Sequence, residues 1–218
     1  MLIRWLGHAS FLLQAADGTK VITDPYESGA YGGGIMHRSI DIQPDIVTVS
    51  HDHADHGYVE GIPGSFEVVR SPGEKSIKGI EVKGIGCFHD LEKGAARGPN
   101  VMFVTTVDGI RIAHLGDLGH ELASCELEQM GEIDVLLIPV GGYYTIGPEQ
   151  ATRVAEQLKP KLIIPMHFKN EKVNLTIGPV DDFLKGKQNV RMSDTSEIEV
   201  TKDSLPAETE IVVLKPAL

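Results

Sequence analysis

The sequence predicts a mixed α/β sandwich that forms one domain. Short runs rich in β-branched residues recur along the whole chain, and segments with helical periodicity alternate with them mainly in the second half. Two Asp-Gly pairs, Asp17-Gly18 and Asp108-Gly109, each separate two such runs, which is a strong hairpin signal. Of the 218 residues, 41% are hydrophobic, so a single domain over residues 1–218 can enclose a large core.

Strands are expected where β-branched or alternating hydrophobic residues are bounded by turn residues. In chain order they cover residues 2–6, both sides of the Asp17-Gly18 turn, 45–50, 65–71, 77–88, both sides of the Asp108-Gly109 turn, 134–142 and 161–168. The charged segment after Glu171 contains two more short strands near its end. Asp24 follows the first hairpin as Asp117 follows the second, so we expect two similar halves with a boundary near residue 100.

Two helices are expected in the second half, over residues 121–133 and 145–160. In the second of them, Pro148 stands where a first helical turn tolerates proline. Three apolar residues then fall on one face of this helix: Ala151, Val154 and Leu158. Two glycine-containing segments are expected to be loops: residues 26–39 and 91–100.

The net charge and the cysteine content limit the classes of partner and the cellular compartment. The formal charge is −11, and an acidic chain repels phosphate backbones, so a nucleic-acid partner is not expected. Cys87 and Cys125 are isolated and form no disulfide framework, which favours a cytoplasmic protein. The first ten residues lack the apolar core of a signal peptide, and no apolar run approaches the length of a membrane span. We therefore expect a small-molecule substrate and no membrane. A homo-oligomer is compatible with the sequence, which leaves the oligomeric state open.

Side chains that bind metals follow several of the predicted strands. The segment SHDHADHG, residues 50–57, places three histidines and Asp55 directly after a β-branched run. His89, Asp117 and His167 each follow another run, and the ends of neighbouring strands often converge on one ligand site. Imidazole nitrogens and carboxylate oxygens suit zinc, so the pattern favours a metal site over a merely hydrophilic loop. His114 lies inside its strand and is expected to be packed or on the surface.

The spacing within residues 50–57 allows two ions. Alternate side chains of a short loop can point the same way, so His51 and His53 could hold one ion while Asp55 and His56 turn toward a second. A shared carboxylate such as Asp117 would complete a two-metal hydrolytic centre, in which the ions are about 3.5–4 Å apart. Asp52 alternates away from these ligands and is expected to support the loop.

The motif HxHxDH over residues 51–56, then His89, Gly116-Asp117 and His167 resembles the metallo-β-lactamase fold superfamily. Within it, the chain is similar to the small metal-dependent hydrolases related to ascorbate-6-phosphate lactonase. Five segments carry that closer similarity: WLGHASFLL, ITDPY, HLGDLGH, LLIPVGGYYTI and KLIIPMHF. The resemblance implies a four-layer αββα sandwich of two mixed β-sheets with helices outside.

The resemblance also implies a ligand set and a chemistry. The first ion would be held by His51, His53 and His89, the second by Asp55, His56 and His167, and Asp117 would bridge them. Asp90, beside His89, is a rival ligand or a supporting residue. Two zinc ions are expected, although such a site also accepts manganese, iron or nickel. A histidine at position 53, where flavin-linked di-iron relatives carry glutamate, argues against a redox site, and the lack of cysteine argues against structural zinc.

The expected reaction is hydrolysis of a small ester, lactone or phosphoester by a metal-bound hydroxide, which Asp55 would orient. A phosphodiesterase or nuclease of the same fold is one alternative, and a metal-binding protein without turnover is another.

Further residues have two interpretations each. His8 either lines the site or packs behind it. His120 either donates a proton to a leaving group or caps a helix. Asp24 either orients a ligand histidine or starts a turn. The glycine-rich loop over residues 141–147 forms a substrate wall or a tight turn. Its candidate substrate contacts are Tyr143, Tyr144 and Thr145. Arg97 and Asn100 could reach the site from the loop over residues 91–100, to which they belong.

Overall fold

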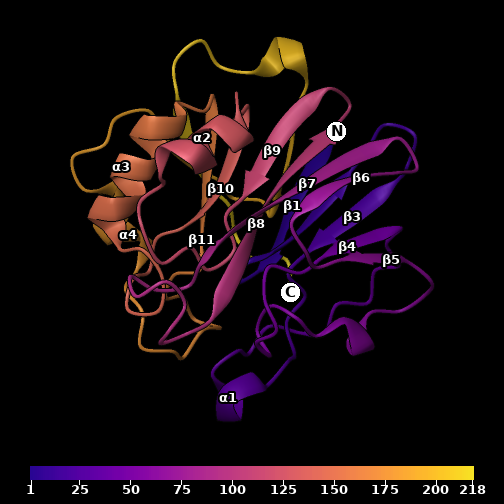
Figure 1. Cartoon of the computed structure of the whole chain (residues 1–218), viewed down its shortest axis with the longest axis horizontal. Helices are drawn as coiled ribbons and strands as arrows, with labels where there is room; N and C mark the ends of the chain where they lie inside the picture. Colours follow the sequence, from indigo (N-terminus) through magenta and orange to yellow (C-terminus); the bar gives the residue numbers. More distant parts are fainter.

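Two mixed β-sheets pack face to face in the computed structural model, which describes residues 1–218 (Figure 1). The first sheet has the order β13 (Glu197–Glu199), β1 (Leu2–Gly7), β2 (Ser10–Gln14), β3 (Lys20–Thr23), β4 (Ile46–Thr48) and β5 (Glu67–Val69). The second has the order β12 (Val190–Met192), β14 (Glu210–Val213), β11 (Leu162–Met166), β10 (Val135–Pro139), β9 (Ile110–His114), β8 (Pro99–Val107), β7 (Ile80–Phe88) and β6 (Gly73–Ile77).

The first sheet is buried on both faces because its strands alternate two sets of apolar residues. Phe11, Val21 and Ile46 belong to the main core between the two sheets. The intervening residues Leu12 and Ile22 belong to a second cluster on the outer face. Residues outside the strands close that outer cluster: Tyr26, Ala30, Ile35, Ile40, Ile62 and Val173.

The helices are distributed unevenly over the sandwich. Beyond the second sheet lie α2 (Ser124–Met130), α3 (Pro148–Leu158) and α4 (Val180–Leu184), which gather on the left of Figure 1. The first half contributes only α1 (Ala30–Gly33) and the 3₁₀ turn η1 (Val59–Gly61), and a second 3₁₀ turn, η2 (Lys202–Ser204), follows β13. The sandwich fold is therefore confirmed, but its outer layer over the first sheet consists mostly of loops.

Most predicted elements are present near their predicted positions. Both Asp-Gly turns join antiparallel strands, β2 to β3 and β8 to β9. Helix α3 begins at Pro148 and buries the three predicted apolar residues. Helix α4, strand β6 and one of the three C-terminal strands were not predicted. Residues 78–79 of the predicted strand over 77–88 form a turn, and α1 is a short irregular turn within the predicted loop.

The sheets do not divide the chain at its middle. The chain passes from the first sheet to the second between β5 and β6, near residue 70. Near the end, β13 returns to pair with β1, while β12 and β14 extend the second sheet. The predicted similarity of two halves about residue 100 stays a prediction. None of the helices combines the length and the apolar composition that a membrane span needs.

Candidate metal centre

The candidate ligands converge because the strands before them run in the same direction within each sheet. His8, Asp24 and residues 50–56 follow β1, β3 and β4, while His89, Asp117 and His167 follow β7, β9 and β11. Backbone hydrogen bonds join the sheets here, from Val101 N to Ser50 O at 2.9 Å and from His167 N to His8 O at 3.2 Å. The carboxyl ends of both sets of strands therefore meet at one edge of the sandwich.

The first group of candidate ligands, which we call the open triad, consists of His51, His53 and His89. One nitrogen from each ring lies within 4.8 Å of the others, and His51 Nε2 is 2.9 Å from His53 Nδ1. The side chains of His51 and His89 are only 5% and 2% exposed, whereas His53 faces solvent. The open triad thus has two enclosed ligands and one exposed ligand.

The second group, which we call the buried group, consists of His8, Asp55, His56 and His167. All four residues are buried, and one ligand atom from each lies within 4.8 Å of the others. His8 Nε2 is 3.0 Å from Asp55 Oδ2, and the His8 and His167 rings are 4.1 Å apart at their centroids. His8 therefore lies against a candidate ligand and does not line the open pocket.

Asp117 lies between the two groups and directs one oxygen to each. Its Oδ2 is 3.1 Å from His89 Nε2 and 3.8 Å from His51 Nε2, both in the open triad. Its Oδ1 is 3.2 Å from His56 Nε2 and 3.4 Å from His167 Nε2, both in the buried group. This is the arrangement that a carboxylate bridging two ions requires.

The charge balance of the buried group fits a cation. His56 Nε2 and Asp117 Oδ1 are buried and lack a hydrogen-bond partner, although they lie close together. Burial by itself would lower the pKa of His56, but the Asp117 and Asp55 carboxylates outweigh it and hold that pKa well above its ordinary value. Two buried carboxylates thus draw positive charge into the site. A dication bound by nitrogen and oxygen donors would supply that charge.

Burial keeps other candidate ligands neutral and able to bind metal. It lowers the pKa of His51 to about 3 and that of His167 to about 3, against the weaker opposing effect of Asp117. A neutral imidazole has a free nitrogen lone pair, which a metal ligand needs.

Asp24 supports a histidine in each group. Its Oδ2 accepts a hydrogen bond from His56 Nδ1 at 2.8 Å and another from the Ser50 hydroxyl. The Ser50 hydroxyl is in turn 2.9 Å from His51 Nδ1. Because each histidine is held through Nδ1, its Nε2 is directed toward Asp117. These hydrogen bonds fit the predicted role of Asp24 in orienting a ligand histidine.

Three residues of the centre have an uncommon backbone conformation. His8, Asp24 and His167 adopt positive φ angles of 51°, 38° and 51°, which are uncommon for residues other than glycine. Gly116, with φ of 53°, is required because an added Cβ would lie 2.5 Å from Asn100 Oδ1. That oxygen also accepts a hydrogen bond from Asp117 N at 3.1 Å, so Asn100 positions the bridging residue.

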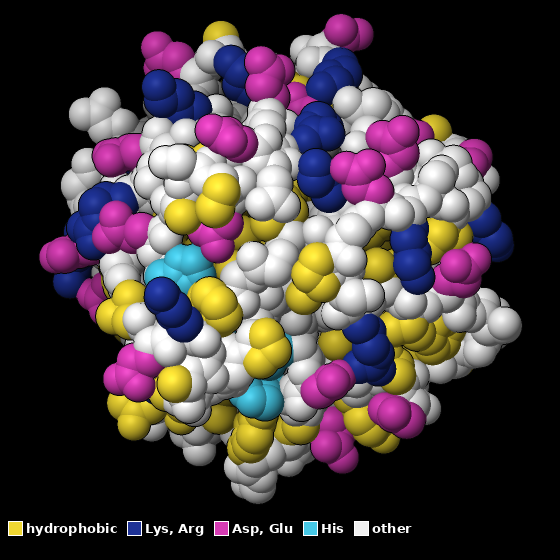
Figure 2. Space-filling model, in the orientation of Figure 1, with side chains coloured by type: hydrophobic (Ala, Val, Ile, Leu, Met, Phe, Trp, Pro, Cys, Tyr) yellow, Lys and Arg dark blue, Asp and Glu magenta, His cyan; other side chains and the backbone are white.

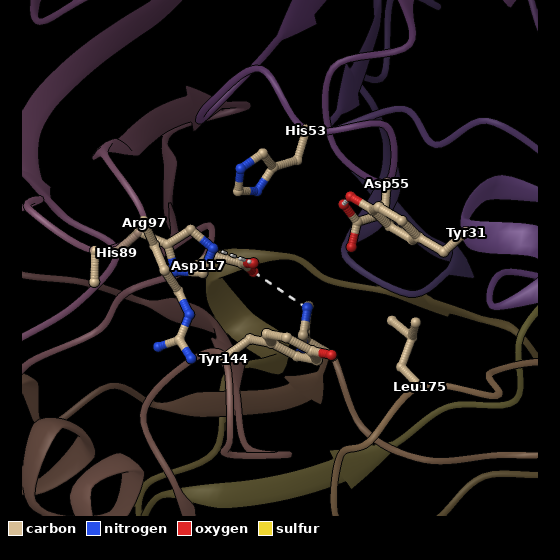
Figure 3. Close-up of a pocket in the computed structure, with 10 residues that line it drawn as sticks. Tyr31, His53, Asp55, His89, Arg97, Asp117, Tyr144 and Leu175 are labelled. Carbon is tan, nitrogen blue, oxygen red and sulfur yellow. Dashed lines mark hydrogen bonds and ion pairs between the residues drawn. The ribbon is translucent and has the colours of Figure 1, made fainter.

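A pocket of about 420 Å³ opens in front of the centre (Figure 3). Tyr144 and Arg97 line it as the sequence suggested. Three further lining residues were not predicted: Tyr31, Ala96 and Leu175. The Tyr31 hydroxyl donates a hydrogen bond to Asp55 Oδ1 at 2.9 Å. The only local signal for Tyr31 was its place among the glycines of a loop, and Leu175 had none.

Several sequence candidates lie outside this pocket. His120 uses both ring nitrogens elsewhere, because Nδ1 donates to Glu121 O at 2.9 Å and Nε2 accepts from Phe88 N at 3.2 Å. Thr145 is buried and its hydroxyl donates to Ile146 O, while Tyr143 projects into a neighbouring hollow. The geometry therefore gives no support to a proton-donor role for His120 or to substrate contacts by Thr145 and Tyr143.

The remaining polar candidates have structural partners. His114 is packed in its strand and Nε2 is 2.7 Å from Ala9 O. Asp90 uses its carboxylate to accept four backbone N–H groups of the following loop, which leaves it poorly placed to act as a rival ligand. Asp52 is exposed and forms an ion pair with Arg70.

Comparisons with known proteins show which family and relatives the chain resembles. Residues 2–167 match the family model described as a β-lactamase superfamily domain. A UPF0173 metal-dependent hydrolase of Pyrobaculum arsenaticum is 30% identical, with 77% of this chain and 84% of that protein covered. One from Methanopyrus kandleri is 27% identical, with 99% and 97% covered. A solved structure from Thermotoga maritima, described as a candidate Zn-dependent hydrolase of the metallo-β-lactamase superfamily, has 38% identity and a TM-score of 0.81, with 98% and 97% covered.

Proposed function

The chain belongs to the metallo-β-lactamase superfamily and is a metal-dependent hydrolase of it, and from that premise we propose that it uses two metal ions, zinc by preference, to hydrolyse a small ester, lactone or phosphoester. The observation that carries the proposal is the position of Asp117, which directs one oxygen to each of two separate ligand groups. When bound, such a pair of ions would lower the pKa of a coordinated water and stabilise negative charge that develops on the substrate.

The protein residues position this chemistry. Asp55 is fixed at both oxygens, by His8 at Oδ2 and by the Tyr31 hydroxyl at Oδ1, so its direction toward the centre is determined before substrate enters. Burial and the nearby Asp55 carboxylate raise the pKa of Tyr31, which keeps its hydroxyl protonated as a donor. Asp24 fixes His56 directly and His51 through Ser50.

The pocket supports a small substrate. Its volume of about 420 Å³ suits a metabolite-sized ligand and cannot hold a nucleic-acid duplex. The face in Figure 2 intersperses Lys and Arg with Asp and Glu and shows no continuous basic surface. Together with the net charge of −11, this favours a small molecule over a long nucleic acid.

Metal analysis and a substrate panel test the proposal. We expect about two metal equivalents per chain and turnover of a generic lactone or ester. Turnover confined to bis-p-nitrophenyl phosphate would favour the phosphodiesterase alternative. Full metal content without turnover on any panel member would favour a metal-binding protein and overturn the proposal.

A further inference from the structure

Arg97 is the one arginine whose guanidinium has no polar partner within the protein. Four of the seven arginines form ion pairs with Asp or Glu: Arg4, Arg70, Arg153 and Arg191. Two others donate to backbone carbonyls, Arg38 to Ala217 and Arg111 to Glu132 and Met130. In a chain with 31 acidic residues, an arginine left unpaired at a pocket wall has its donors available for a ligand.

The loop that carries Arg97 is fixed in place. The Asp90 carboxylate accepts hydrogen bonds from four backbone N–H groups, including that of Arg97 at 2.7 Å. Gly98 closes the loop, because its N–H donates to Gly94 O at 2.9 Å and its carbonyl accepts from His89 N at 3.2 Å. The backbone of Arg97 is thereby held at a set position relative to His89, so less ordering of this loop is needed when a ligand binds.

Tyr144 holds the guanidinium from the other side. The Arg97 Cζ atom lies 5.6 Å from the centre of the Tyr144 ring, within the range of a cation–π contact. Such a contact uses the face of the guanidinium and leaves the N–H groups at its edge free. Figure 3 shows Arg97 and Tyr144 on one side of the pocket and Tyr31 and Leu175 on the other.

Arg97 is also the only arginine or lysine among the ten residues that line the pocket. The lining includes Asp55 and Asp117, but neither forms an ion pair with Arg97. The pocket therefore combines a polar wall that carries a free guanidinium with a wall of apolar and aromatic side chains. Guanidinium groups bind carboxylates and phosphates through paired hydrogen bonds.

We infer that Arg97 and Tyr144 form a subsite for an oxyanion of the substrate, a carboxylate or a phosphate, that is not itself the reacting group. This inference rests on the proposed function, because it assigns a second contact to the substrate of the same centre. It predicts that substrates carrying such an anion are preferred over neutral molecules of the same length.

Two nitrophenyl esters of equal length test the subsite through turnover. The metal-loaded protein is assayed with mono-4-nitrophenyl glutarate, which is anionic, and with 4-nitrophenyl valerate, which is neutral. In Arg97→Gln, the ratio of kcat/KM for the anionic over the neutral ester is expected to fall by about tenfold, the effect of losing one charge-assisted hydrogen bond. Arg97→Lys should restore part of the ratio, because it keeps the charge but not the paired donors. Arg153→Gln is the matched control, since Arg153 is exposed and outside the pocket, and it should leave the ratio unchanged.

A binding measurement separates failure of the subsite from failure of the hydrolase proposal. The metal-loaded wild type, R97Q and R153Q proteins are titrated by calorimetry with glutarate and with inorganic phosphate. A loss of about tenfold in R97Q for one anion supports the subsite and identifies which anion it accepts, even if neither ester is hydrolysed. Equal affinities in wild type and R97Q, or no binding by the wild type, would overturn the inference. If both esters are turned over with an unchanged ratio in R97Q, the subsite is wrong while the hydrolase proposal stands.

Discussion

The open triad and the buried group are built from similar side chains but differ in burial and support. In the open triad, the His53 side chain faces solvent and has only His51 as a hydrogen-bond neighbour. In the buried group, Asp55 is held by two side chains and His56 by Asp24. Since fixed ligands lose less entropy on binding, we expect the buried group to hold its ion more tightly and the open triad to exchange its ion more readily.

Asp117→Asn should have the largest effect, because it removes the one charge that both groups share. We expect loss of both ions and of turnover, and a fall in metal affinity beyond the roughly 10–100-fold typical of a supporting residue. Metal content by mass spectrometry and kcat/KM measure this. Asp52→Asn, at an exposed aspartate of the same histidine-rich segment, should change neither quantity. Two retained equivalents in D117N would disprove the bridging role.

Replacing one ligand in each group tests the comparison directly. We expect His53→Ala to keep about one metal equivalent, because the buried group remains complete. His167→Ala removes a fully enclosed ligand and should lose the more tightly held ion and destabilise the fold. Metal content and thermal unfolding of the two variants provide the measurement. The reverse pattern, with the tighter ion lost in H53A, would mean that burial does not set the order of affinity.

His37 is a buried histidine outside both groups, so it shows the effect of histidine burial on stability without an effect on metal binding. Burial lowers its pKa to about 4, against the raising effect of its hydrogen bond to Leu218 O. As the pH falls, His37 takes up a proton near pH 6.5 in the unfolded chain but only near pH 4 in the folded chain. The contribution of His37 to the free energy of unfolding is therefore fully present above pH 6.5 and is lost as the pH falls from 6.5 to 4. The loss by pH 4 is about 3 kcal/mol. Urea unfolding at several pH values should show a smaller loss for His37→Phe; identical pH slopes for the two proteins would count against this assignment.

Ser50→Ala should have the smallest effect and should act unevenly. It removes the hydroxyl between Asp24 and His51, while the direct bond from Asp24 to His56 remains. We expect affinity for the more weakly held ion to fall about tenfold and the tighter ion to be unaffected. Competitive titration with a chelator resolves the two steps. Ser71→Ala, at an exposed serine, is the control; an equal loss at both steps in S50A would show that Asp24 supports the two groups as one unit.

The sequence was most informative where side chains follow strands. The carboxyl ends of β7, β9 and β11 lie along one edge once the second sheet forms, so the convergence of His89, Asp117 and His167 followed from local patterns. The packing of the two sheets adds the end of β4, and with it His51. Tyr31 and Leu175 come from loops whose approach to the pocket depends on how those loops pack over the first sheet. No local pattern records that packing. The suggested role of His120 rested only on its closeness to Asp117 in sequence, and the chain turns it toward Phe88 and Glu121 instead.

Both ligand groups take residues from both sheets. His51 and His53 follow the first sheet while His89 follows the second, and His8, Asp55 and His56 follow the first while His167 follows the second. An ion in either group would therefore cross-link the two sheets and resist sliding of one sheet over the other. The same ligand atoms would then form the reactive centre and link the two sheets. A change that weakens the packing between the sheets should therefore also alter the distances between the metal ligands, on which the chemistry depends.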